Sequence, residues 1–172
     1  MDLGCLVPDV VLGSVLEVTP AWLGGRGLRG LILDLDNTLV PYGQRSPDPA
    51  VMRHITAIRG AGTPAIILSN ARSGRAARIA TELDLPFIAN AGKPRAASFE
   101  RALQLLELAA AQVAAVGDQL FRDVLGAKKA GCLAVYVRPL SPRDFPGTKL
   151  LRWPEALLIA HLQRRGRWPT GV

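Results

Sequence analysis

Two carboxylates separated by a single residue, Asp34 and Asp36, directly follow an apolar run in this 172-residue chain. A carboxylate can attack phosphorus and form an aspartyl-phosphate, which divides a difficult hydrolysis into two easier steps. Side chains two residues apart point to the same side of an extended backbone, so Asp36 could protonate the leaving oxygen and later activate water. The pair is therefore suited to phosphoryl transfer.

Two more carboxylates, Asp118 and Asp123, follow a later apolar run. Mg²⁺ prefers hard oxygen ligands and keeps several of its waters. Asp34, the backbone carbonyl of Asp36 and Asp118 could supply such oxygens. The bound cation would offset the repulsion between an anionic nucleophile and an anionic phosphate. We predict a Mg²⁺ site formed by Asp34, Asp36 and Asp118.

Hydroxyl, amide and ammonium groups near these positions could hold the phosphate. The Ser69 hydroxyl and the Lys93 ammonium can bind the phosphoryl oxygens over which charge spreads in the transition state. Asn37 and Thr38 follow the first carboxylate pair, and Asn70 follows Ser69. We predict that all five residues bind phosphate and that Lys93 also acts in catalysis.

These residues need a scaffold that brings distant parts of the chain together. Apolar runs rich in Val, Ile and Leu alternate with segments of helical periodicity, which predicts an α/β fold with a five-stranded, mainly parallel sheet between two helical layers. The predicted strands are Gly30–Leu35, Pro64–Ser69, Pro86–Ala89, Val113–Gly117 and Cys132–Val137. The predicted helices are approximately Asp48–Arg59, Ser73–Leu83, Pro94–Leu108, Arg122–Ala130 and 153–165, the last with Pro154 in its first turn.

Ligands of open parallel sheets bind at the carboxyl ends of the strands. The carboxylates, Ser69 and Lys93 each follow a predicted strand, so we expect them at one edge of one sheet. Four stretches in this order resemble the motifs of the haloacid dehalogenase (HAD) superfamily, and the resemblance covers about residues 28–140. The stretches are Asp34-Leu35-Asp36-Asn37-Thr38, Ser69-Asn70, Gly92-Lys93-Pro94 and Gly117-Asp118-Gln119-Leu120-Phe121-Arg122-Asp123.

The resemblance implies a Rossmann-like three-layer sandwich and a role for each motif residue. Because phosphatases of the superfamily carry an acidic residue at the position of Asp36, it also implies phosphatase chemistry. The implied roles are nucleophile for Asp34, acid/base for Asp36, metal ligand for Asp118, orientation of a metal-bound water or of Lys93 for Asp123, and phosphoryl binding for Ser69 and Lys93.

The intervals between the motifs are short. Thirty residues separate Thr38 from Ser69 and 22 separate Asn70 from Lys93, which is room for one helix and its loops but not for a cap domain. The chain thus resembles the capless subclass III, whose open site accepts a bulky substrate.

The motif sequences also resemble the YqeG-type branch of the superfamily, which is similar to phosphatidylglycerophosphate phosphatases. The implied reaction removes the terminal phosphate of phosphatidylglycerophosphate and leaves phosphatidylglycerol. Arg122 departs from the small hydroxyl residue expected at its position, which affects the fine geometry beside Asp123. A HAD phosphatase for a soluble or macromolecular phosphoester is the alternative.

The net charge of +7 favours anionic partners. Arg72, Arg75 and Arg78 would form one stripe on a helix, either at the site or as a solvated face. A tail with basic residues and tryptophans is either an interfacial contact with anionic lipid or a helix packed on the domain. Its residues are Lys149, Arg152, Trp153, Arg164, Arg165, Arg167 and Trp168. A non-enzymatic nucleic-acid-binding domain is a third hypothesis, against which the complete carboxylate set argues.

The chain is expected to form one HAD-like domain over residues 1–172, with a lead-in (1–29), a catalytic core (30–140) and a basic C-terminal segment (141–172). It has no apolar stretch long enough to span a membrane and no cleavable signal, which predicts a cytoplasmic protein, with peripheral membrane contact as a further expectation. The sequence leaves the oligomeric state open.

Overall fold

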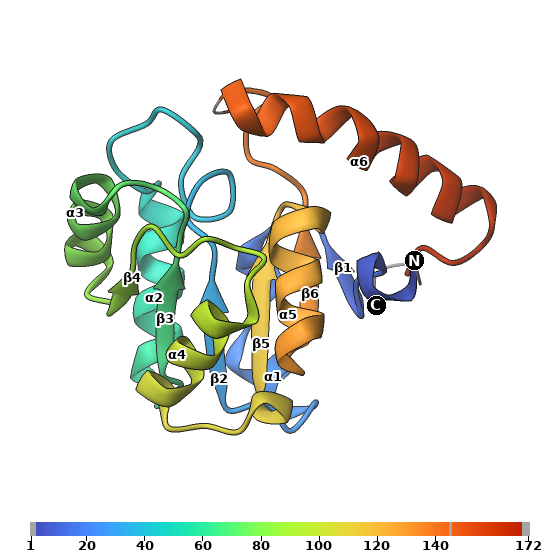
Figure 1. The fold of residues 1–172 in the computed structure, drawn as a ribbon. Coiled ribbons are helices and arrows are strands. Elements are labelled where there is room, and N and C mark those ends of the chain that lie inside the picture. The colour runs from blue at the N-terminus through green and yellow to red at the C-terminus, as the bar shows by residue number, and fades with distance from the viewer. Residues whose placement is uncertain (1–2, 145, 170–172) are drawn as a thin grey trace.

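A six-stranded, entirely parallel sheet forms the centre of the computed structural model, which describes residues 3–144 and 146–169 (Figure 1). The strand order is β1-β6-β5-β2-β3-β4. The strands are β1 (Val10–Leu12), β2 (Gly30–Leu33), β3 (Ala65–Leu68), β4 (Phe87–Ile88), β5 (Val113–Gly117) and β6 (Leu133–Val137). β2 and β5 lie side by side in the middle, with Leu33 opposite Val116. The residues that follow these two strands therefore emerge next to each other.

Helices cover both faces of the sheet. They are α1 (Pro20–Gly24), α2 (Pro49–Gly60), α3 (Ser73–Leu83), α4 (Ala96–Leu106), α5 (Leu125–Ala130) and α6 (Pro146–Arg164). Alternate strand residues face opposite layers: Leu31 and Leu33 pack with α2 and α3, whereas Ile32 packs with α4 and α5. The α/β three-layer prediction is confirmed.

The predicted number of strands is wrong, because the lead-in contributes the edge strand β1 beside β6. Asp9 directly precedes β1. In the structure its backbone N–H donates to the carbonyl of Ala134 at 2.8 Å, and its carboxylate accepts from the Ala134 N–H at 2.8 Å. Asp9 thus begins the pairing with β6, and Lys128 forms an ion pair with it. The division into lead-in, core and tail stays a prediction.

Four of the predicted helices, α2 to α5, are found with small shifts of their ends. Asp48 caps α2 by accepting from the N–H of Ala50 at 2.7 Å, as expected for an aspartate before a helix that begins with proline. The segment expected as one helix over Arg122–Ala130 is a π-helical turn, Leu120–Val124, followed by α5. Short 3₁₀ turns lie at Leu3–Leu6, Val15–Glu17 and Ala110–Gln112.

The C-terminal helix is longer than predicted. α6 begins at Pro146, so Pro154 lies inside the helix and not in its first turn. A proline there lacks the N–H that would bond to the carbonyl four residues earlier. Figure 1 shows α6 beyond the carboxyl ends of β5 and β6. After α6, Trp168 packs edge-on against Tyr136 with ring centroids 5.4 Å apart.

Candidate active site

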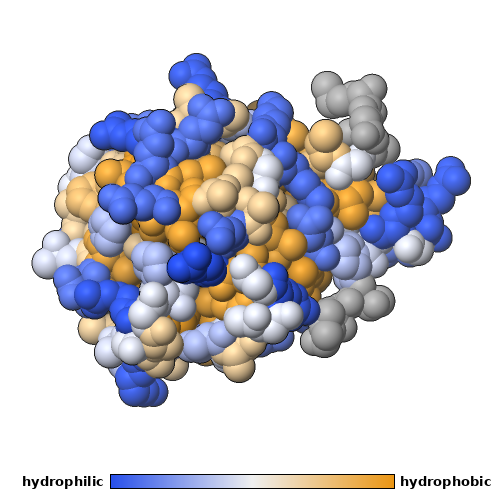
Figure 2. Space-filling model, turned by 90° about the horizontal axis from the view of Figure 1, so that it is seen from below, coloured by the Kyte–Doolittle hydropathy of each residue, from blue (hydrophilic) through white to orange (hydrophobic). Residues whose placement is uncertain are grey.

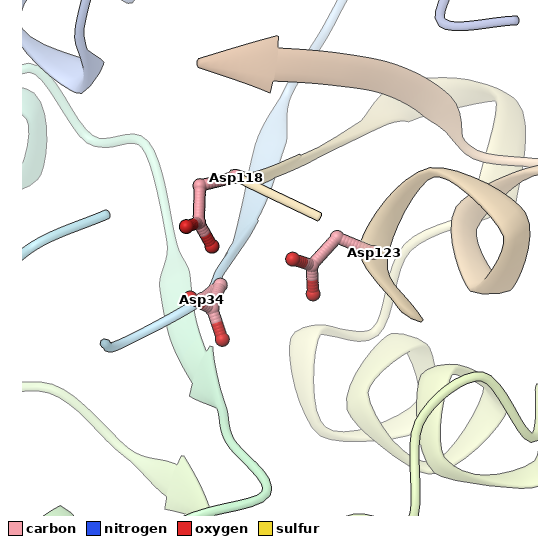
Figure 3. A group of neighbouring side chains, drawn as sticks. All are labelled: Asp34, Asp118 and Asp123. Atoms are coloured by element: carbon pink, nitrogen blue, oxygen red, sulfur yellow. The ribbon is translucent and has the colours of Figure 1, made fainter. Parts of the chain in front are cut away.

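Three buried carboxylates converge at the carboxyl edge of the sheet. Asp34 follows β2, Asp118 follows β5, and Asp123 lies in the π-helical turn. Within the described chain, one oxygen from each of them lies within 4.8 Å of the other two, and Figure 3 shows the three side chains turned toward the same region. β2 and β5 are adjacent parallel strands that end at the same level, which explains why residues more than 80 positions apart converge here.

Lys93 lies among these carboxylates. Its Nζ donates to Asp34 Oδ1 at 2.5 Å and to Asp123 Oδ1 at 2.6 Å, and its side chain is only 3% exposed. Asn70 holds the backbone of Lys93, because Asn70 Oδ1 accepts from the Lys93 N–H at 2.9 Å and Asn70 Nδ2 donates to the Lys93 carbonyl at 3.3 Å. Asn70 therefore positions the lysine.

The second oxygens of Asp34 and Asp118 identify a place for a cation. Asp34 Oδ2 and Asp118 Oδ1 are buried and have no hydrogen-bond partner, and a buried carboxylate oxygen without a partner is costly. Burial raises the pKa of Asp34 to about 6, although Lys93 opposes this. Burial and the nearby Asp34 raise the pKa of Asp118, although Arg152 opposes this. A divalent cation on the two free oxygens would favour the charged forms.

Lys93 stays charged in this environment. Burial alone would lower its pKa, but the ion pairs with Asp123 and Asp34 outweigh burial and raise it above the ordinary value. The lysine is therefore a fixed positive charge beside Asp34 and not a proton donor at neutral pH.

Gly117 makes room for the carboxylate of Asp123. A Cβ atom at Gly117 would lie 2.3 Å from Asp123 Cγ, so any larger residue would displace this side chain. Asp123 is further held by the backbone N–H of Gln119, which donates to Asp123 Oδ2 at 3.1 Å. The last position of β5 and the turn after it thus fix Asp123 against Lys93.

Asp36 lies beside the acidic cluster and has a different partner. Arg75 from α3 donates to Asp36 Oδ1 through Nε at 2.9 Å and through Nη2 at 2.7 Å. Arg75 Nη1 also donates to the Gln44 carbonyl at 2.5 Å. Of the predicted arginine stripe, this member is therefore anchored at the site. The metal contact predicted for the Asp36 carbonyl stays a prediction.

Asn37 serves as a structural link in this arrangement. It adopts a left-handed backbone conformation, with φ of 64°, which asparagine tolerates better than most residues. Its amide Nδ2 donates to the Arg143 carbonyl at 2.8 Å and to Asp144 Oδ1 at 2.9 Å, while its Oδ1 accepts from the Tyr42 N–H at 3.0 Å. Both hydrogens of the Asn37 amide are donated within the protein, so the side chain has none left to donate to a phosphate in this arrangement. The phosphate contact predicted for Asn37 stays a prediction.

Ser69 and Thr38 are buried near the carboxylates. Ser69 Oγ accepts from the Ala71 N–H at 3.0 Å, which leaves its hydroxyl hydrogen available to a ligand. Thr38 Oγ1 is buried without a partner. Their predicted roles in phosphate binding stay predictions.

A cleft of about 690 Å³ opens at this edge of the sheet. Three arginines, Arg72, Arg75 and Arg122, line it together with Asp34 and Lys93. The cleft also contains Asp36, Ser69 and Asn70. It can therefore admit an anionic ligand as far as the Asp34 carboxylate.

Arg152 belongs to the site although it lies outside the four sequence motifs. Its Nη1 donates to the Asp118 carbonyl at 2.6 Å, Nη2 pairs with Asp118 Oδ2, and Nε donates to Asp144 Oδ2 at 2.7 Å. Sequence reasoning placed Arg152 only in the basic tail. Only the fold brings α6 to the end of β5.

A parallel sheet between two helical layers, with carboxylates and a lysine gathered at its carboxyl edge, defines a Rossmann-like α/β protein with an acidic cluster that could hold a cation. Residues 90–139 match the family model described as HAD-hydrolase-like. Over 160 residues, 93% of each chain, the protein is 32% identical to "Probable phosphatase YqeG" of Bacillus subtilis (strain 168). The chain therefore belongs to the HAD superfamily, in the YqeG-type branch.

Solved structures share this fold at low identity. The cobalt-bound deoxy-D-mannose-octulosonate 8-phosphate phosphatase of Haemophilus influenzae is 19% identical with a TM-score of 0.55, over 65% of this chain and 69% of that one. A haloacid dehalogenase-like hydrolase of Streptococcus pneumoniae is 16% identical with a TM-score of 0.52, over 64% of this chain and 84% of that one. These likenesses support the three-layer fold.

Proposed function

We propose that the protein is a Mg²⁺-dependent phosphomonoester hydrolase that forms an aspartyl-phosphate on Asp34. As a HAD-type phosphatase, it needs a carboxylate that is accessible to phosphate and held in place. The single observation that carries the proposal is the state of Asp34: Lys93 holds one oxygen, the other oxygen has no partner, and the residue lines the cleft.

In the first step one oxygen of the Asp34 carboxylate attacks phosphorus, and the bond between phosphorus and the ester oxygen breaks. Asp36 gives its proton to the departing oxygen. Lys93 stays protonated beside Asp34 and stabilises the negative charge that develops on the phosphoryl group. In the second step Asp36 takes a proton from water, the water oxygen bonds to phosphorus, and the bond to Asp34 breaks.

The acidic cluster fits a magnesium ion. Two of its members, Asp34 and Asp118, each have a buried oxygen that lacks a partner, and hard carboxylate oxygens suit this ion. Asp34, Asp118 and the backbone carbonyl of Asp36 are the proposed ligands. Asp123 accepts a hydrogen bond from Lys93 and so keeps the lysine in place beside Asp34. When bound, the ion would supply positive charge that offsets the repulsion between the phosphate and Asp34.

We propose phosphatidylglycerophosphate as the substrate. The wide cleft and the short intervals between the motifs leave space for a bulky headgroup, and the arginines of the cleft suit its two phosphates. Within the described residues, no helix is long and apolar enough to cross a membrane. We propose that the protein reaches lipid peripherally, at the cytoplasmic face of an anionic membrane.

The surface of α6 supports this access. Leu150, Trp153 and Leu157, the apolar row, are 80%, 76% and 58% exposed, and basic residues 164, 165 and 167 are exposed at the end of the helix. Figure 2 shows hydrophilic side chains on the projection at the right, the side to which α6 extends in Figure 1. Exposed apolar and aromatic groups beside cations suit an anionic lipid surface. The side chain of Lys149, which was also predicted to belong to the basic tail, lies outside the described residues.

A substrate panel tests the proposal. Phosphate release is measured with phosphatidylglycerophosphate in vesicles, with p-nitrophenyl phosphate and with a soluble alkyl phosphate, using Asp34→Asn as the control. The expected result is the highest kcat/KM on the vesicles and no turnover by the control. Preference for a soluble ester without vesicle binding would favour the alternative phosphatase. No turnover, together with binding of nucleic acid that falls steeply with salt, would favour the non-enzymatic hypothesis.

A further inference from the structure

Arg152 reaches from α6 to both the backbone and the carboxylate of Asp118. One nitrogen of its guanidinium donates to the Asp118 carbonyl at 2.6 Å, and a second pairs with Asp118 Oδ2. A planar guanidinium that holds two oxygens of one residue fixes that residue more tightly than a single point charge does. The orientation of the Asp118 side chain therefore depends on Arg152.

The contact with Arg152 makes the two carboxylate oxygens of Asp118 unequal. Arg152 binds Oδ2, whereas Oδ1 is buried and has no partner. Asp118 is fully buried, so water does not compensate for a wrong rotamer. Arg152 thus leaves free only the oxygen that belongs to the candidate cation site.

Arg152 is itself held from two sides. Its Nε donates to Asp144 Oδ2 at 2.7 Å, and Asp144 Oδ1 accepts from Asn37 Nδ2 at 2.9 Å. One turn along α6, the buried Glu155 lies 3.6 Å from Arg152 and accepts from the Phe121 N–H at 2.9 Å. A continuous network therefore runs from Asn37, in the loop after β2, through Asp144 and Arg152 to the residues after β5.

We propose that Arg152 is a positioning residue, which holds Asp118 so that Oδ1 faces the cation and which makes docked α6 a condition for full Mg²⁺ affinity. The inference rests on the proposed role of Asp118 as a metal ligand. Partners that orient metal ligands commonly change metal affinity by about 10- to 100-fold when they are removed. Arg152 has this relation to Asp118 although it comes from outside the four motifs.

The test compares Arg152→Gln and Arg152→Lys with Arg101→Gln, an exposed arginine on α4. Calorimetric titration with MgCl₂ measures binding without turnover, and hydrolysis of p-nitrophenyl phosphate at varied Mg²⁺ gives kcat, KM and the half-saturating Mg²⁺ concentration. We expect Arg152→Gln to weaken Mg²⁺ binding about tenfold, with KM for the ester changed less than about threefold. Arg152→Lys should recover part of the Mg²⁺ affinity, because it keeps the positive charge but lacks the planar guanidinium that binds two oxygens of Asp118.

Unchanged Mg²⁺ affinity with lower thermal stability would overturn the inference and leave Arg152 a structural residue. Tighter Mg²⁺ binding in Arg152→Gln would also overturn it, since Arg152 would then compete with the cation. If Arg152→Gln does not fold, the same comparison rests on Arg152→Lys. If the wild-type protein binds no Mg²⁺, the proposed function itself is refuted. If the wild-type protein binds Mg²⁺ and the Arg152 variants bind it equally well, only the inference about Arg152 is refuted.

Discussion

The carboxyl edge of the sheet and helix α6 hold their polar groups in different ways. At the edge, Asp34 and Asp118 follow adjacent strands, and their backbone positions are set by the pairing of β2 with β5. α6 is attached through side chains, among them Arg152 and Glu155 at that edge and the fully buried Leu162. The apolar row along the same helix is exposed.

The different attachment of the sheet edge and of α6 suggests different roles for the two regions. A ladder of backbone hydrogen bonds tolerates the loss of one side chain, so substitutions at the edge should remove chemistry and leave the fold. A helix attached through a few side chains can change its position without disturbing the sheet. We therefore expect the edge to determine whether phosphate is hydrolysed, and α6 to determine where the substrate is met and how well Asp118 is oriented.

Asp34→Asn should have the largest effect. The amide keeps the shape of the side chain but cannot serve as the nucleophile, so kcat should fall by at least about 10³-fold. Lys93 keeps Asp123 as its partner, so circular dichroism should remain that of the folded protein. Substantial residual turnover with a native spectrum would rule out the nucleophile assignment.

Withdrawal of Mg²⁺ should have a similarly large effect on activity. A chelator should stop phosphate release, added Mg²⁺ should restore it, and Ca²⁺ should restore it poorly because Ca²⁺ takes more ligands at longer distances. Phosphate release after each addition measures this. Full activity in the chelator would show that Lys93 and the arginines suffice, and the acidic cluster would then need another explanation.

Much of the edge was predictable from the sequence because its residues occupy fixed places relative to strands. Asp34, Ser69 and Asp118 each follow a buried apolar run, and parallel strands end at one edge. The edge strand β1 was missed because it is only three residues long and its pairing begins with Asp9, a residue that resembles an interruption.

The contacts of α6 were not predictable in the same way. Arg152 and Asp144 lie outside the motifs, and no periodicity indicates which face of a helix containing Pro154 packs on the body. The two tryptophans of the basic C-terminal segment, alike in sequence context, differ in the structure: Trp168 packs on Tyr136, whereas Trp153 is 76% exposed. Tertiary packing decides such cases, and local composition does not.

Arg75→Gln should have an intermediate effect that depends on the leaving group. Arg75 donates two hydrogen bonds to one oxygen of Asp36, which fixes the carboxyl group proposed as the acid. Loss of this contact should lower kcat about tenfold on an alkyl phosphate, which needs a proton on its leaving oxygen. On p-nitrophenyl phosphate, whose leaving group needs little protonation, the loss should be smaller.

Arg78→Gln is the matched control, because Arg78 lies on the same helix and is exposed. It should leave both substrates unaffected. Equal losses on the two esters in Arg75→Gln would mean that Arg75 acts by binding phosphate and not through Asp36.

The smallest effect on chemistry is expected from the apolar row of α6. Deleting residues 153–172 would be a poor test, because it also removes the buried Glu155 and Leu162. Leu157→Ser together with Trp153→Ser changes only exposed side chains and keeps Arg152. If the row enters a lipid surface, each lost side chain removes about 1 kcal/mol or more of apolar burial, so binding to anionic vesicles should weaken at least tenfold.

Leu105→Ser provides the control for this last comparison, because Leu105 on α4 is 58% exposed, the same fraction as Leu157. Vesicle co-sedimentation and hydrolysis of p-nitrophenyl phosphate are measured for all variants. The double variant should lose vesicle binding while its activity on the soluble ester stays within about twofold, and Leu105→Ser should lose neither. A parallel fall in both measurements would mean that the exposed face of α6 helps to hold Arg152 in the site, and the two regions would then act as one.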